Sequence, residues 1–253
     1  MIVLLKQELR DLWLGGRGLM LSVAFSMLLS VISYLVATNR ALNFLEQRES
    51  VNLTLQVAIA VGALLTLLAG ADAISGERER GTLESLLVTP TSRPAIAVAK
   101  AVATLSLWLA SFLIALPYVW FLGRGIGLVG VAAATSFAVG ALLAVFLAAF
   151  GVAISMVSAT NRVSLSASLF LLLALFVPTQ LPSSAQQGWA GELLLRVNPL
   201  TAGEHYIGRV IVNGRAWSDE LTWLLSPLVA AVVLAALMVA LAPRFVRLRG
   251  EAA

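Results

Sequence analysis

Hydrophobic positions in this chain come in long unbroken blocks, and the charged residues are confined to the segments between them. Six intervals contain no Asp, Glu, Lys or Arg, and each has between 22 and 37 residues. They cover residues 18–39, 50–71, 101–123, 125–161, 163–191 and 221–243. A helix needs about 20 apolar residues to cross a hydrocarbon layer roughly 30 Å thick, and each interval is long enough. The pattern therefore predicts an all-α integral membrane protein with six transmembrane helices.

The whole chain, residues 1–253, is interpreted as one transmembrane domain. We expect its spans at about 18–38, 53–74, 95–122, 128–157, 163–182 and 222–242. The fourth interval is too long for one crossing and too short for two crossings and a turn, so we interpret it as one long tilted helix. Gly123 and Gly127 form a lone GxxxG pattern, which we assign to a turn around Arg124 rather than to a helix dimer.

The first 17 residues predict a separate amphipathic helix ahead of the first span. Helical spacing places its larger apolar side chains on one face and its charged side chains on the other. The apolar face comprises Ile2, Leu5, Leu9, Leu12 and Trp13, and the charged arc comprises Lys6, Glu8, Arg10 and Asp11. Val3 and Leu4 fall outside the apolar face. Trp and long basic side chains favour the membrane interface, so we expect an interfacial helix, with a solvated leader as the alternative.

Basic residues are unevenly divided between the two sides of the predicted membrane. With six spans, 11 of the 17 Lys and Arg residues lie on the side of the two termini, and 6 lie on the other side. Because basic residues are retained on the cytoplasmic side, we expect both termini in the cytoplasm and the chain in the plasma (inner) membrane. The sequence pI of about 10.1 then reflects contact with lipid head groups, and no nucleic-acid partner is expected.

The residues that membrane enzymes need are missing. The chain has no Cys, one His and two Lys, which excludes thiolate sites, multi-histidine metal centres and a GxxxxGK[ST] phosphate-binding loop. We therefore expect no catalytic residue, metal site or cofactor on this chain. Asp72, at the end of the second span, is the nearest ionisable residue to the membrane interior. We interpret it as an interfacial residue, with a place in a substrate pathway as the alternative.

The connection at about 75–94 is longer than a simple turn requires. Thr82 is placed to cap a short helix, Glu84 to lie in its first turn, and Pro90 to stop it. Leu83, Leu86 and Leu87 would share one face of that helix. A helix lying on lipid head groups is one reading. The alternating acidic and basic residues before the helix favour a protein partner instead, because an anionic lipid surface repels carboxylates.

The segment ADAISGERERGTLESLLVTPTSR, residues 71–93, resembles the loop between the second and third spans of ABC-2 type exporter permeases. The charged leader, the six spans and the Asn-Pro-Leu-Thr element at 198–201 share this resemblance, and the opening of the segment is similar to permeases for copper-enzyme maturation, gliding or drug export. The resemblance implies a short cytoplasmic coupling helix, docked on a separate ABC ATPase that holds ATP and Mg, and a homodimer or a paired permease chain in the lipid. It implies ATPase-coupling contacts at Glu77, Arg78, Glu79, Arg80, Gly81, Thr82, Leu83, Glu84 and Leu87.

The region 183–221 is expected on the outer side. Thr201 and Glu204 form a capping-box pattern, which predicts a short helix that continues to about Val212. His205 would then lie in its first turn, and we interpret it as an ordinary surface residue. The resemblance implies that this region is a re-entrant or helical external gate, with Asn198, Pro199, Thr201 and Glu204 as its candidate residues.

Together these expectations describe the permease subunit of an ATP-driven exporter, with the ATPase on another chain. A membrane anchor or assembly factor for a cytoplasmic ATPase, without a transport path of its own, is the alternative. The substrate is not indicated by any of these patterns.

Overall fold

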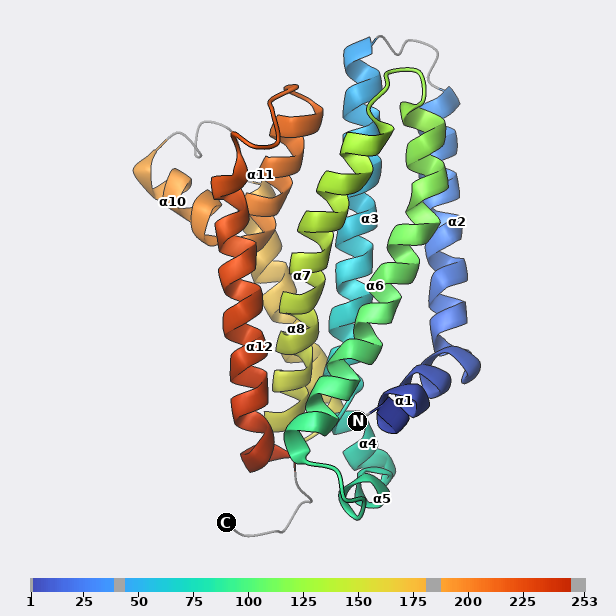
Figure 1. The fold of residues 1–253 in the computed structure, drawn as a ribbon, viewed down its shortest axis with the longest axis vertical. Coiled ribbons are helices and arrows are strands. Elements are labelled where there is room, and N and C mark those ends of the chain that lie inside the picture. The colour runs from blue at the N-terminus through green and yellow to red at the C-terminus, as the bar shows by residue number, and fades with distance from the viewer. Residues whose placement is uncertain (1, 39–43, 181–187, 247–253) are drawn as a thin grey trace.

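The computed structural model describes residues 2–38, 44–180 and 188–246, and every regular element in these ranges is a helix. Six helices are long and apolar enough to cross a membrane, so the all-helical, six-span prediction is confirmed. They run roughly parallel in one bundle (Figure 1). These helices are α2 (Arg17–Thr38), α3 (Phe44–Asp72), α6 (Arg93–Gly123), α7 (Val129–Val157), α8 (Asn161–Phe176) and α12 (Leu225–Phe245).

Shorter elements gather at the two ends of the bundle. One end holds α1 (Ile2–Leu14), α4 (Ser75–Arg80) and α5 (Leu83–Leu87). The other end holds α10 (Trp189–Val197), α11 (Pro199–Ile211) and the short 3-10 helices η1 (Val177–Gln180) and η2 (Leu221–Leu224). We call these the α4–α5 end and the α10–α11 end. The described parts of both chain ends lie at the α4–α5 end (Figure 1).

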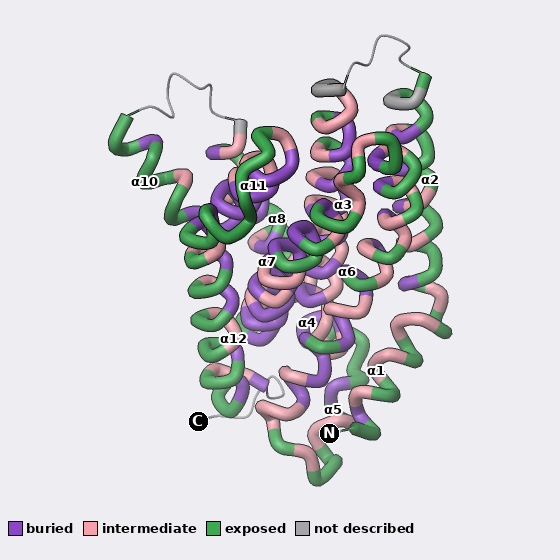
Figure 2. The backbone as a smooth tube through the Cα atoms, turned by 45° about the horizontal axis from the view of Figure 1, so that its top comes forward, coloured by how far each residue is buried: buried purple, intermediate pink, exposed green. Residues whose placement is uncertain are grey.

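The centre of the bundle is the pair α3 and α7. About 56% of the span in α3 and 61% of the span in α7 is buried, against 17–28% in the other four spans. Glycines allow these two backbones to approach closely: a Cβ atom on Gly151 would lie 2.6 Å from the carbonyl oxygen of Leu67. Small residues at such seams permit the dispersion contacts that hold membrane helices together. Figure 2 shows the buried positions following these inner helices.

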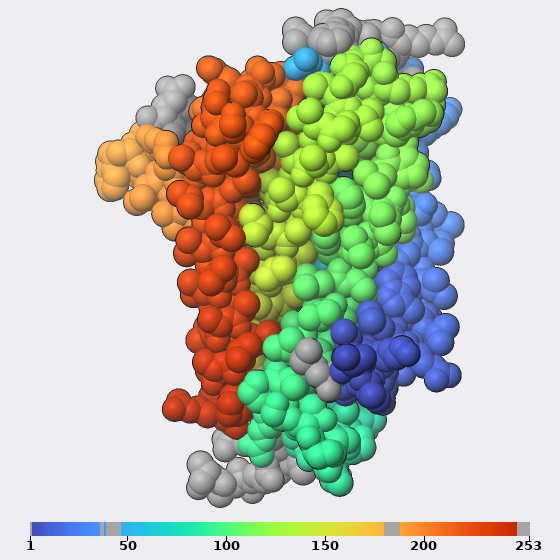
Figure 3. Space-filling view, in the orientation of Figure 1, coloured from blue at the N-terminus to red at the C-terminus, as the bar shows by residue number. Residues whose placement is uncertain are grey.

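The outer helices expose large apolar side chains. Met20 on α2, Phe170 on α8 and Val232 on α12 are 60–75% exposed. In water such surfaces would be costly, whereas lipid chains cover them in a membrane. The long uninterrupted faces of α6 and α12 are visible in Figure 3, with α1 seated beside the α4–α5 segment.

Some boundaries differ from those the charge pattern suggested. The second span was expected from residue 53, but α3 begins at Phe44 and the part of it that could cross a membrane begins at Gln47. A helix continues through charged residues once it leaves the hydrocarbon layer, so charge marks the membrane boundary better than the helix end. The fifth span ends in η1, and residues 181–182 of its expected range lie outside the described residues. The turn between α6 and α7 has Gly127 at φ +67°.

Candidate functional site

The short helix α4 is anchored on the middle of the bundle end by small hydroxyl side chains. The backbone amides of Ile74 and Ser75 donate to Ser155 Oγ of α7 at 2.9 and 2.8 Å. Gly81 then ends the helix in the left-handed conformation at φ +71°, with its amide and that of Thr82 donating back to α4 carbonyls. Such an ending favours glycine, because other side chains are strained there. This turn sets the direction of α5.

A buried lysine joins α1, α4 and α6. Lys100 of α6 is 1% exposed, and its Nζ donates to Glu8 Oε1 at 2.7 Å and to Glu77 Oε1 at 2.6 Å. Burial raises the pKa of Glu77, and the neighbouring Glu8 carboxylate adds to this, while Lys100 opposes it. One ammonium group is therefore shared by two carboxylates in a mostly buried position. Removing the ammonium would leave two carboxylates without a compensating charge.

A second cation, Arg78, joins α4 to the ends of two spans. Its guanidinium donates to the carbonyl oxygens of Ser158 at 2.8 Å and Met156 at 3.1 Å, both at the end of α7. It also donates to the carbonyl oxygen of Phe245, the last residue of α12, at 3.2 Å. The last carbonyls of a helix lack partners within the helix and carry partial negative charge. Arg78 satisfies carbonyls of two helices at once.

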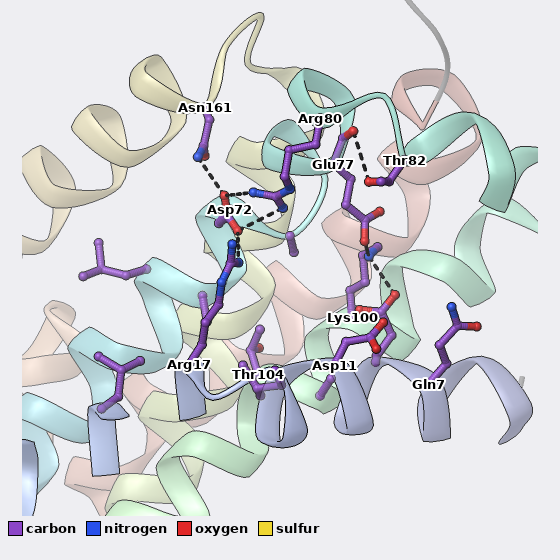
Figure 4. Close-up of a pocket in the computed structure, with 18 of the residues that line it drawn as sticks. Gln7, Asp11, Arg17, Asp72, Glu77, Arg80, Thr82, Lys100, Thr104 and Asn161 are labelled. Carbon is purple, nitrogen blue, oxygen red and sulfur yellow. Dashed lines mark hydrogen bonds and ion pairs between the residues drawn. The ribbon is translucent and has the colours of Figure 1, made fainter. Parts of the chain in front are cut away.

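Asp72, at the end of α3, bonds to residues at the ends of three other helices. Its carboxylate accepts from Arg17 at the start of α2 at 3.1 Å, from Arg80 of α4 at 3.3 Å, and from Asn161 Nδ2 at the start of α8 at 2.7 Å (Figure 4). Glu79 Oε1 accepts the backbone amide of Asn161 at 2.8 Å. The carboxylate thus lies at the membrane-span boundary, in an ion-pair cluster rather than inside a span.

The next helix, α5, has an inner and an outer face. Leu83 is fully buried, Leu86 and Leu87 are half-buried, and Glu84 and Val88 are exposed. The predicted side-chain cap at Thr82 is wrong: its backbone is already helical, and its Oγ1 donates back to the Glu77 carbonyl instead of accepting an α5 amide. Gly81 reverses the chain one residue earlier, so no capping side chain is needed.

Between α1, the spans and the α4–α5 segment lies a cavity of about 840 Å³. Side chains of both charge clusters, including Arg17, Asp72, Glu77 and Lys100, line it (Figure 4). Its deeper wall is apolar, with Leu65 among the lining residues. No group of three or more potential metal-ligating side chains occurs in the described ranges.

Comparison with protein families explains this architecture. A model described as ABC-2 family transporter protein matches residues 2–249. The chain belongs to the ABC-2 transporter family. It is therefore a multi-pass membrane permease component of a transporter, a type of subunit that is generally not itself catalytic. A search of curated proteins finds no match.

The structure places the predicted coupling residues of this permease in two different environments. Glu77, Arg78 and Leu83 are engaged inside the chain, whereas Glu84 is exposed. Sequence reasoning missed Glu8, Arg17, Lys100 and Asn161 as partners. Lys100 lies within the expected third span, 95–122, and its spacing of four residues from the apolar Ile96 places the two on one helix face.

The contacts of the amphipathic helix α1 also differ from the prediction. Leu4 was placed outside the apolar face of α1, but it is the buried residue of that helix and packs in the same cluster as Leu83. Glu8, assigned to the solvated arc, lies one turn further on the same side and reaches Lys100. Trp13 Nε1 donates to Ser106 Oγ of α6 at 3.0 Å. The predicted segment is helical, but the ion pair between Glu8 and Lys100 determines which face of α1 packs on α6.

At the opposite end of the permease, α11 begins earlier than expected. The predicted capping box of Thr201 and Glu204 is wrong: Asn198 Oδ1 accepts the Leu200 amide at 2.9 Å, and Pro199 occupies the first turn. Proline favours that position because its missing N–H would have no partner there. Thr201 Oγ1 instead donates to the Leu195 carbonyl at 3.0 Å, which ties α11 to α10.

Polar side chains on α11 form a half-buried cluster. Arg209 donates to His205 Nε2 at 2.8 Å and to Glu220 at 3.2 Å, and the His205 ring lies 4.2 Å from the Trp223 ring. The expectation that His205 is an ordinary surface residue in the first turn is therefore wrong. Burial lowers the pKa of His205 and raises the pKa of Glu204 to about 7.

Proposed function

We propose that this ABC-2 permease is the membrane subunit of an ATP-driven exporter and that α4 and α5 receive the motion of a separate ATPase. ATP and Mg would bind to the ATPase chain. The docking side would be the cytoplasm, with both termini there and the protein in the plasma (inner) membrane. The excess of basic residues on that side supports this orientation.

The observation that carries the proposal is the attachment of one short segment to seven helices. Through Lys100, Arg78 and Asp72, α4 is tied to α1 and to the ends of five spans: α2, α3, α7, α8 and α12, with α6 supplying the lysine. A force applied to α5 would therefore reach the spans as a rigid-body displacement rather than be lost in a flexible loop. Such displacements are a common means of switching membrane and multidomain proteins.

Two roles follow for the coupling residues. Gly81, Thr82, Glu84 and the half-buried Leu87 lie on or near the exposed part of the segment, and they would contact the ATPase. Inside the chain, a second group would transmit the displacement. That group comprises Glu77, Arg78, Glu79, Arg80 and Leu83.

At the α10–α11 end we propose an external gate. The support is that α11 turns back into the bundle: a Cβ on Gly203 would lie 2.7 Å from Val139 Cγ1 of α7. Tyr206 and Ile207 are also buried there, in the main core cluster. A helix held by apolar contacts to one central span can move with that span. A second permease chain, identical or similar, would complete the pathway within the lipid.

The test is the rate of ATP hydrolysis by the cognate ATPase, free and in complex with the permease. An exporter predicts that complex formation changes the rate, and that Glu84→Lys with Leu87→Lys returns it to that of the free ATPase. The control variant is Glu49→Lys, an exposed carboxylate at the far end of α3. A membrane anchor predicts equal rates for free and bound ATPase, and that result would overturn the proposal.

A further inference from the structure

Three charged or polar residues around the 840 Å³ cavity mark one level of the membrane. Arg17 is the first residue of its span, Asp72 the last of its span, and Asn161 the first of its span. Both Arg17 and Asn161 bond to Asp72, at 3.1 and 2.7 Å. Three span ends held together at one point lie at the depth of the lipid head groups, because that is where the hydrocarbon layer begins.

One helical turn deeper, the same three helices line the cavity with leucine. Leu21 follows Arg17 by four residues, Leu68 precedes Asp72 by four, and all of them line the cavity. Leu165 stands in the same relation to Asn161 on α8. A spacing of four residues keeps each pair on one helix face, about 6 Å apart along the axis. The cavity is therefore polar at head-group depth and apolar at acyl-chain depth.

The polar part of the cavity contains two clusters of opposite charge balance. Arg17 and Arg80 share the single carboxylate of Asp72, which leaves an excess of positive charge. Glu8 and Glu77 share the single ammonium of Lys100, and Asp11 lines the cavity beside them, which leaves an excess of negative charge. Figure 4 shows the two clusters as neighbours, with Arg17 and Asp72 to the left and Glu77 and Lys100 to the right.

The acidic cluster also has an unused acceptor. Glu77 Oε1 bonds to Lys100, but Oε2 is buried and has no hydrogen-bond partner among the described residues. A buried carboxylate oxygen without a partner is costly. A ligand N–H group would satisfy it once the side chains that cover this oxygen turn aside. Guanidinium groups, in turn, bind phosphate oxygens well, because their paired N–H donors match the spacing of those oxygens.

We propose that this cavity binds the head group of an aminophospholipid from the leaflet that α1 faces. The phosphate would lie against Arg17 and Arg80, the primary amine against Glu77, and an acyl chain along Leu21, Leu68 and Leu165. A free phosphoethanolamine has the same polar chemistry, but it would leave the apolar wall uncovered. The site requires neither the ATPase nor a direction of transport, so it stands or fails independently of the proposed function.

The experiment is native mass spectrometry of the full chain with added dioleoyl phosphatidylethanolamine, phosphatidylcholine, phosphatidylglycerol or phosphoethanolamine. We expect about tenfold stronger retention of phosphatidylethanolamine than of phosphatidylcholine, about 1.4 kcal/mol, since a quaternary ammonium cannot donate a hydrogen bond. Equal retention of these two lipids overturns the proposal, as does stronger retention of phosphatidylglycerol. Binding of phosphoethanolamine as tight as that of the lipid overturns the lipid assignment.

Variants separate the two halves of the head group. Arg17→Gln should weaken the retention of phosphatidylethanolamine and phosphatidylglycerol alike. Glu77→Gln should instead remove the preference for phosphatidylethanolamine over phosphatidylcholine. Asp11→Asn, an exposed change on α1, provides a second probe of the amine side if Glu77→Gln folds poorly. Asp219→Asn at the α10–α11 end is the matched control, and it should bind like the unaltered chain. An unchanged lipid preference in both acidic variants contradicts the assignment of the amine.

Discussion

The two ends of this permease are held together by different forces. At the α4–α5 end, two cations join α4 to four other helices: Lys100, which is 1% exposed, to α1 and α6, and Arg78 to α7 and α12. At the α10–α11 end, the main contacts are apolar. There α11 packs on the central core, and its main ion pair, Arg209 with Glu220, remains within the same end.

This difference has mechanical consequences. Directional bonds from one buried cation to several helices fix their relative positions, and breaking any one leaves an uncompensated charge or carbonyl. Apolar contacts are not directional, so a helix held by them can separate or slide at lower cost. This difference agrees with the proposed roles, in which the α4–α5 end transmits displacement and the α10–α11 end opens. Substitutions at the two ends should therefore differ in how much stability they remove and in how many helices they affect.

The largest effect is expected from Lys100→Met, which keeps the side-chain length and removes the charge. Glu8 and Glu77 would lose their shared ammonium, and such losses cost about 3–5 kcal/mol. The matched control is Lys6→Met, the other lysine of the chain, which is exposed. Thermal unfolding in detergent should show a large loss for the first variant only. Adding Glu8→Gln and Glu77→Gln should restore much of the stability, and equal stability of the two lysine variants would contradict the role of the triad.

The second-largest loss of stability is expected from Arg78→Lys. Lysine keeps the charge but cannot reach three carbonyl oxygens with a planar fork, so about 2–3 kcal/mol should be lost. Arg80→Lys, two residues away and 44% exposed, should cost well under 1 kcal/mol. Hydrogen exchange should show faster opening of the α7 and α12 ends in the Arg78 variant. Protection there that matches the Arg80 variant would contradict the bridging role.

A third effect concerns pH at the α10–α11 end. The folded-state pKa of Glu204 is about 7, above its ordinary 4.5, so this group favours the folded state fully below pH 4.5 and loses that contribution as pH rises through about 7. The shift corresponds to roughly 3 kcal/mol, reduced to about 2 by partial exposure. His205 has a lowered pKa and stays neutral above 6.5, so it does not disturb the upper part of the window.

We therefore expect hydrogen exchange in α11 to quicken between about pH 5 and 7, beyond the intrinsic rate change, and to level off above about pH 7.5. Glu204→Gln should remove this dependence, because the amide does not ionise. Exchange at α4, measured in the same samples, serves as the internal reference. A pH dependence of α11 that persists in Glu204→Gln would show that another group is responsible.

The smallest effect is expected from Gly203→Ala. The added methyl would lie 2.7 Å from Val139 Cγ1, so α11 must shift away from α7 at a cost of about 1–2 kcal/mol. Gly208→Ala on the same helix meets nothing within 4 Å and is the control. Limited proteolysis should cut the first variant faster near α11 and leave the α4–α5 end unchanged. Faster cutting at both ends would contradict the mechanical separation of the two ends.

The sequence revealed the spans more readily than the contacts between them. Span number follows from local composition, since each helix must cross the same hydrocarbon thickness. The charge clusters depend on which helix ends meet, so neither the partners of Lys100 nor the burial of Leu4 followed from the pattern along the chain. At α11 two capping patterns overlapped, and Pro199 favoured Asn198 over Thr201. Both capping patterns are present in the sequence, but the sequence alone does not show which of them caps α11.

Movement of the far end of the permease by ATP, passed on through α4 and α5, can be measured directly. The chain has no cysteine, so Gly130→Cys and Asn213→Cys, both exposed near that end, can carry spin labels without background. In the complex with its ATPase, ATP and Mg should shift the distance between the labels by about 5 Å. Glu84→Lys with Leu87→Lys should abolish the shift. A distance unaffected by ATP in the unaltered complex would contradict the account.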